Sequence, residues 1–139
     1  MSAGAERTPG TRAPESGSAG WRFDDAGLLD ALESVSLDDI DSIGFGLIVM
    51  DRDARVLGYN ASESRLSGLP PDSVVGRNFF VVVAPCTNNY LVAQRYADEQ
   101  ELDEKLDYVF TFRMAPTPVR LRLLARRGSP RQYLAVQPR

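Results

Sequence analysis

The spacing of apolar residues changes twice along the chain, and each change marks a boundary. Residues 1–20 are rich in Gly, Ala, Ser and Pro and show no apolar period, which predicts a disordered tail. From Leu28 to Val35 apolar residues recur at helical spacing, with Asp24 or Asp25 as the expected N-cap. A helix this short is marginal in water. We therefore expect residues 21–39 to form a helical cap that docks on the main domain, residues 40–139.

The first half of the main domain predicts a hairpin followed by helices. The compact apolar run 45–50 reads as a strand that pairs with residues 55–59 through a polar turn. Asn60 is a suitable N-cap for a short helix that ends at Leu66. The apolar positions between Tyr90 and Ala97 fit a longer helix.

The last third of the chain alternates with period two, which is typical of strands. Residues 108–114, 119–123 and 132–136 read as strands, and the Pro- and Gly-containing segments 115–118 and 128–130 read as turns. Two strands, several helices and then three strands predict an α+β domain with a five-stranded antiparallel sheet flanked by helices.

Composition and charge exclude several classes of function. The 139 residues leave room for one domain, and a net charge of −3 argues against nucleic-acid binding. The longest apolar stretch, 79–85, is too short to span a membrane, and the N-terminus lacks a signal-peptide core. We therefore expect a cytoplasmic protein. Arginines gather near the C-terminus, where we expect them on the solvated face and turns of exposed strands: Arg120, Arg122, Arg126, Arg127, Arg131 and Arg139.

The chain contains no histidine and a single cysteine, Cys86. The absence of histidine removes the usual general base, the usual catalytic triads and the commonest metal ligand. One cysteine allows no internal disulfide. We expect neither an enzyme nor a metal protein.

Two groups of residues could carry chemistry. Tyr59, Glu63 and Ser67 are spaced by four, so a phenol, a carboxyl group and a hydroxyl could converge at the start of a helix. The alternative is three unconnected side chains, two of them solvated. Cys86 is a reactive thiol if a cation or helix N-terminus lies beside it, and a small buried hydrophobe otherwise; a helix opening at Asn88 would favour the first.

Five segments together resemble the photoactive yellow protein family, in its order and nearly its spacing. The resemblance runs from about Ile40 to the C-terminus. The segments are Gly44-Phe45-Gly46, Tyr59-Asn60-Ala61-Ser62-Glu63, Gly76-Arg77-Asn78-Phe79-Phe80, Val83-Ala84-Pro85-Cys86-Thr87 and Met114-Ala115-Pro116-Thr117.

This resemblance implies a PAS-like fold and a covalent chromophore. In the family the cysteine carries 4-hydroxycinnamic (p-coumaric) acid as a thioester, so Cys86 inherits that role. Tyr59 and Glu63 match the residues that hydrogen-bond the phenolic oxygen, and Ser67 stands where a threonine usually supports the tyrosine. The remaining positions that line the pocket are Leu69, Phe79, Val83, Ala84, Thr87, Phe110, Phe112 and Met114. In the family the position of Met114 is associated with dark recovery.

Besides Ser67, four positions depart from the family pattern. Leu69 replaces an arginine that shields the ring, and Phe112 replaces a tyrosine. Leu134 falls where a tryptophan is common, so the packing of the cap is expected to differ. Ser64 follows Glu63 where glycine is usual.

The resemblance implies a blue-light photoreceptor. Trans–cis isomerisation of the chromophore would break its hydrogen bonds. The phenolate would then take the proton of Glu63, and the cap would loosen. A downstream signalling protein would read the change, and the receptor would be a monomer or weak homodimer. Two other readings stay open: a PAS module without chromophore that binds a ligand or a protein, and a cysteine enzyme such as a thiol peroxidase, which the missing second cysteine disfavours.

Overall fold

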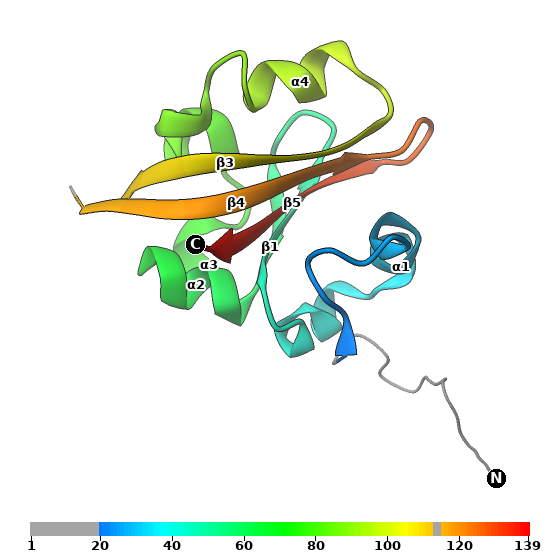
Figure 1. The fold of residues 1–139 in the computed structure, drawn as a ribbon, viewed down its shortest axis with the longest axis horizontal. Helices are drawn as coiled ribbons and strands as arrows, with labels where there is room; N and C mark the ends of the chain where they lie inside the picture. Colours follow the sequence, from blue (N-terminus) through cyan, green and yellow to red (C-terminus); the bar gives the residue numbers. More distant parts are fainter. Residues whose placement is uncertain (1–19, 113–114) are drawn as a thin grey trace, which may run out of the picture.

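A computed structural model describes residues 20–112 and 115–139. The predicted tail, apart from Gly20, and Met114 lie outside these residues. Five antiparallel strands form one sheet in the order β2-β1-β5-β4-β3, shown in Figure 1. The strands are β1 Gly46–Asp51, β2 Val56–Tyr59, β3 Leu102–Phe112, β4 Ala115–Ala125 and β5 Arg131–Pro138. The α+β prediction with a five-stranded antiparallel sheet is confirmed.

Helical elements cover both faces of this sheet. On one face lie α1 (Leu28–Ser34) and the 3-10 helix η2 (Leu37–Ser42), which belong to the cap and its connection. The segment between β2 and β3 covers the other face. It contains α2 Ala61–Ser67, α3 Pro71–Val74, η3 Phe79–Val83, η4 Pro85–Thr87 and α4 Ala93–Asp98.

The alternation of side chains along each strand divides the core into two clusters. In β5, Leu134 and Val136 join the cluster under α2–α4, whereas Tyr133 and Ala135 join the cluster under the cap. This distribution follows from the period of two in a strand. It corrects the expectation for Leu134, which lies on the face opposite the cap, and the aromatic side chain that meets the cap is its neighbour Tyr133.

The hairpin and the first helix form as the sequence predicts. Oδ1 of Asp51 accepts from the backbone N–H groups of Asp53 and Arg55, which closes the β1–β2 turn. Oδ1 of Asn60 accepts from the N–H of Glu63 and caps α2. The helix ends at Gly68, whose positive φ of 77° suits glycine.

The predicted turn at residues 115–118 is wrong, because these residues already belong to β4 and pair with β3. Pairing between β4 and β5 begins only at Val119. The carbonyl of Pro118 accepts from the N–H of Arg139, so the side of Pro118 that lacks an N–H points away from β3. A proline is tolerated at such a strand edge, where no ladder bond is lost.

Two helix predictions also need correction. α1 begins after Gly27 with no side-chain cap, so neither Asp24 nor Asp25 is its N-cap. The helix expected from residue 90 is the six-residue α4, which begins at Ala93, and Tyr90 lies outside it with 76% of its surface exposed. Among the helices that the structure describes, none has the length and apolar character needed to cross a membrane.

Candidate functional site

Tyr59, Glu63 and Ser67 meet at the junction of β2 and α2. Tyr59 ends the strand, and the helix that starts after Asn60 brings the other two side chains to the sheet. All three are buried, with Glu63 fully inaccessible to solvent. The Tyr59 hydroxyl donates to Ser67 Oγ over 2.8 Å. The structure therefore brings the three residues together in the interior rather than leaving them in solvent.

The carboxyl group of Glu63 is buried without a hydrogen-bond partner for either oxygen among the described residues. Burial raises the pKa of Glu63 to about 8, and the nearby Tyr59 hydroxyl lowers it only in part. Burial also raises the pKa of Tyr59, and the Glu63 carboxyl adds to that rise. At neutral pH the site therefore holds a protonated carboxyl whose O–H can donate a hydrogen bond to an incoming acceptor.

Gly46 makes room for this carboxyl group. A Cβ atom at this position of β1 would clash with Glu63 Oε1 and approach the backbone of Val136. Glycine inside a strand often marks such a close approach. Sequence reasoning did not select Gly46 as a site residue, although a glycine in an otherwise apolar strand was a usable signal.

Ser67 connects the tyrosine to the segment that follows the helix. Its Oγ accepts from Tyr59 and also from the backbone N–H of Leu69, over 3.1 Å. Ser64 Oγ donates to the Leu69 carbonyl over 2.7 Å. Ser64 and Ser67, which both depart from the family pattern, therefore hold the two backbone polar groups of Leu69 through their hydroxyls.

Cys86 lies in the three-residue helix η4 and is half-buried. It packs against the cluster that contains Tyr59 and Phe110. Because α4 begins only at Ala93, Cys86 does not lie at the N-terminus of that helix, which removes the activation considered from sequence.

Two residues that sequence reasoning missed hold the backbone of Cys86. The Tyr108 hydroxyl donates to the Cys86 carbonyl over 2.5 Å, and Asn89 Nδ2 donates to the same oxygen over 3.2 Å. Asn89 Nδ2 also donates to the Tyr108 hydroxyl over 2.6 Å. The signal was a tyrosine within the alternating pattern of β3, where phenylalanine would have served packing alone.

The other predicted pocket residues lie in the same core cluster, with exceptions. Phe79, Ala84 and Phe110 are buried there, and Leu69 and Val83 pack against it. Thr87 is buried, but its hydroxyl donates to the Ala84 carbonyl over 2.7 Å, so it supports the loop. Phe112 belongs to β3, its side chain is not described, and Met114 lies outside the described residues.

Comparison with known proteins identifies the class first. The family model of the PAS fold matches residues 40–136. The PAS domain of the HTR-like protein from Haloarcula marismortui is similar in structure at 16% identity, with a TM-score of 0.60, and covers 79% of this chain and 96% of its own. This chain is therefore a PAS domain.

Closer relatives define the family within that class. The photoactive yellow protein of Halochromatium salexigens is 36% identical over 97 residues, which cover 68% of this chain and 78% of the relative. The photoactive yellow protein domain of the sensor histidine kinase Ppr from Rhodospirillum centenum shares 37% identity with a TM-score of 0.69 and covers 80% of this chain and 97% of its own. The chain belongs to the photoactive yellow protein family, and such homologues support a role as a photoreceptor or sensor.

Proposed function

We propose that this protein is a blue-light photoreceptor that carries 4-hydroxycinnamic acid as a thioester on Cys86. Tyr59 and Glu63 would hold the phenolic oxygen. The observation that carries the proposal is the fully buried Glu63 carboxyl, whose oxygens have no hydrogen-bond partner among the described residues. Burial raises its pKa, which favours the protonated form. A buried polar group without a partner is unfavourable, and an acceptor oxygen placed beside it would remove that cost. The chromophore would serve detection of light rather than catalysis. We therefore propose a sensor, not an enzyme, that acts in the cytoplasm.

The hydroxyl network around Tyr59 can adapt to such a ligand. Ser67 Oγ accepts from Leu69 N–H and Tyr59 O–H, so its own proton is free to be donated. If Ser67 donates to the Tyr59 oxygen instead, the Tyr59 proton becomes available to a ligand. Two donors, Tyr59 and Glu63, would then stabilise a phenolate, which otherwise forms only near pH ~10.

The bound group would supply absorption of blue light and photoisomerisation. The protein's part is to hold a proton at Glu63 until the hydrogen bond is broken. Loss of that proton would leave a carboxylate fully buried and unpaired. Such a charge costs several kcal/mol, a large share of the roughly 5–15 kcal/mol that hold a domain together. Local unfolding of the least anchored element would relieve it, and the cap, residues 21–39, is the candidate.

One structural feature keeps the second candidate function open. Leu69 replaces the family's shielding arginine and is only partly buried against the core. A PAS module without the chromophore, binding another small molecule at the same site, would retain Glu63 as a donor. Its Cys86 would then be a packing residue rather than an attachment point.

The first prediction tests attachment. Supplied with activated 4-hydroxycinnamic acid, the protein should turn yellow, bleach in blue light and gain the mass of one acyl group. Because Cys86 is the only thiol, Cys86→Ala should gain neither colour nor mass while its circular dichroism stays unchanged. A retained adduct in the variant would place the attachment elsewhere, and a colourless wild type would favour the chromophore-free module.

The second prediction tests the proton. In blue light, amide exchange in residues 21–35 should become faster by at least about tenfold, which corresponds to ~1.4 kcal/mol of lost protection. Glu63→Gln cannot release a proton, so its exchange should respond much less while it still takes up the chromophore. Equal acceleration in both proteins would mean that the charge on Glu63 does not drive the change.

A further inference from the structure

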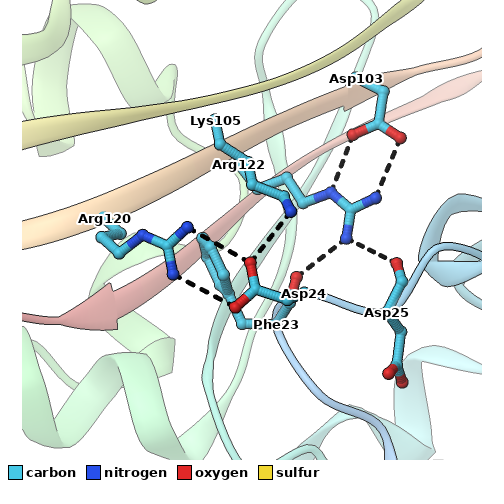
Figure 2. Close-up of polar contacts among 7 residues, drawn as sticks. All are labelled: Phe23, Asp24, Asp25, Asp103, Lys105, Arg120 and Arg122. Carbon is cyan, nitrogen blue, oxygen red and sulfur yellow. Dashed lines mark hydrogen bonds and ion pairs between the residues drawn. The ribbon is translucent and has the colours of Figure 1, made fainter.

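Ion pairs join residues 21–36, the part of the cap that includes α1, to the sheet, and the charges are divided in the same way in each pair. Asp24 pairs with Lys105 over 3.0 Å and with Arg120 over 3.2 Å, and Asp30 pairs with Arg126. Figure 2 shows Asp24 between the two cations of β3 and β4. In each of these pairs the acid belongs to the cap and the base to the sheet.

Arg122 of β4 also joins the sheet to the cap, from a buried position. It is 3% exposed, which corrects the prediction of a solvated strand arginine. Two of its nitrogens donate to Asp103, over 2.8 and 3.0 Å, and Nη1 donates to the carbonyls of Phe23 and Asp25, over 2.9 and 2.7 Å. As Figure 2 shows, the cap contributes only backbone oxygens to this guanidinium. They come from two consecutive turns before α1, so an occupant needs this backbone shape rather than particular side chains.

At the other end of the cap, side chains of the sheet form hydrogen bonds with the C-terminal end of α1. Glu33 accepts hydrogen bonds from the hydroxyls of Tyr133 and Ser129. Arg131 Nη1 donates to the carbonyl of Val35 over 3.1 Å. These groups lie on β5 and the turn before it. The sheet therefore presents hydrogen-bond donors along the whole length of α1.

Apolar packing supplies the remaining contact. Phe23, Leu28 and Leu32 are at most 1% exposed and pack in one cluster with Leu124 and Tyr133 of the sheet. Exposed ion pairs contribute little to affinity, whereas buried apolar side chains contribute most of it. The charges select which segment binds, and the leucines hold it.

The charge of the chain is divided in the same way. Residues 21–36 contain four carboxylates and one arginine, whereas residues 37–139 contain thirteen acidic and thirteen basic side chains. Residues 21–36 therefore carry a charge of −3, equal to the net charge of the whole chain. Residues 37–139 without this segment are neutral overall, and the face that it covers is basic and partly apolar.

We propose that the cap occupies the binding surface of a partner protein, and that this partner contributes an acidic amphipathic helix preceded by a short turn segment. The occupant must supply two backbone oxygens for Arg122, leucine-like side chains one helical turn apart, and carboxylates for Arg126 and for the Tyr133–Ser129 pair. The cap must leave before the partner binds. This inference requires no chromophore, so its failure is distinguishable from failure of the proposed function.

The test uses a fluorescein-labelled peptide of residues 21–36 as the probe, with full-length, chromophore-free protein. Wild-type protein should bind it weakly, because the tethered cap competes at high effective concentration. Leu28→Ala/Leu32→Ala weakens the tethered cap and leaves the sheet unchanged, so the peptide should bind at least about tenfold tighter by fluorescence anisotropy. Should this variant not fold, Asp24→Asn/Asp30→Asn removes only surface ion pairs and should shift affinity in the same direction.

Substitutions on the sheet, made in the Leu28→Ala/Leu32→Ala protein with its loosened cap, identify the surface that binds the peptide. Arg122→Gln should weaken peptide binding by about tenfold, and Arg126→Gln, which removes an exposed ion pair, by about two- to threefold. Arg127→Gln is the matched control, since Arg127 is exposed and pairs with Glu101 of the sheet domain; it should bind as the background does. A peptide that carries Asp24→Asn, Asp30→Asn and Glu33→Gln should bind more weakly than the unmodified peptide, and its binding should depend less on salt.

Three results would overturn the proposal. The loosened protein could fail to bind the peptide, or could bind it equally well without Arg122 and Arg126. It could also form a concentration-dependent dimer by light scattering, in which case the cap of a second copy, not a partner protein, fills the surface.

Discussion

Glu63→Gln should remove most of the pH dependence of stability of the chromophore-free protein between pH 4 and pH 9. Burial raises the pKa of Glu63 to about 8 in the folded protein, against 4.5 for an exposed glutamate. Below pH 4.5 both states hold the proton, and the buried carboxyl is neutral. As the pH rises from 4.5 to 8, the unfolded chain loses the proton while the folded protein keeps it, so stability falls with increasing pH.

The size of the effect follows from the shift. Each pKa unit corresponds to ~1.36 kcal/mol, so the wild type should lose up to about 5 kcal/mol relative to the variant before the difference levels off above pH 8. The glutamine amide is also buried, but its cost does not change with pH. Urea unfolding of both proteins at four pH values measures the difference directly.

Glu101→Gln is the control for this series, because Glu101 is exposed and pairs with Arg127 at the surface. Its stability curve should run parallel to the wild type. A Glu63→Gln curve that also stays parallel would show that Glu63 is not held neutral in the folded protein. Its role as proton donor would then have no basis.

Local sequence signals predicted the site better than its surroundings. Tyr59, Glu63 and Ser67 are joined by one turn and one short helix, so their convergence depends only on Asn60 starting that helix. Their burial depended on the sheet, where Gly46 leaves space for the carboxyl group. That contact joins residues from two elements, and periodicity along one element does not contain it.

The errors have a common physical origin in contacts between distant segments. A strand arginine is normally solvated, but Arg122 is covered by residues 23–25, almost a hundred positions away in sequence. Pro116 and Pro118 suggested a turn, yet β4 extends past the end of β5 and tolerates them at its free edge. Leu134 was expected to change the packing of the cap, but the alternation of β5 places it on the opposite face and its neighbour Tyr133 on the cap side.

The two faces of the sheet are linked through the same strands. In β4, Leu121 and Leu123 point into the cluster that contains Tyr59 and Phe110, and Leu124 and Arg122 point to the cap. A change in packing beneath α2 is therefore separated from the cap only by the thickness of the sheet. This arrangement makes the cap the nearest element that can respond without unfolding the sheet.

Leu32→Ala should separate the cap from the sheet domain. Leu32 is fully buried between α1 and the sheet, and such a truncation typically costs ~2–5 kcal/mol. The seven-residue α1 cannot persist alone in water. We therefore expect the cap to undock as a unit, with hydrogen-exchange protection lost in residues 28–34 and kept in β1, β4 and β5.

Leu121→Ala is the matched control, because Leu121 is equally buried but lies in the cluster on the opposite face. Its loss should lower the global free energy of unfolding, while the local opening of the cap stays as in the wild type. The two leucine variants thus separate local from global opening. If Leu32→Ala instead lowers protection of cap and sheet amides equally, the cap and residues 40–139 form one cooperative unit. The cap could then not leave its surface, for light or for a partner, without unfolding the domain.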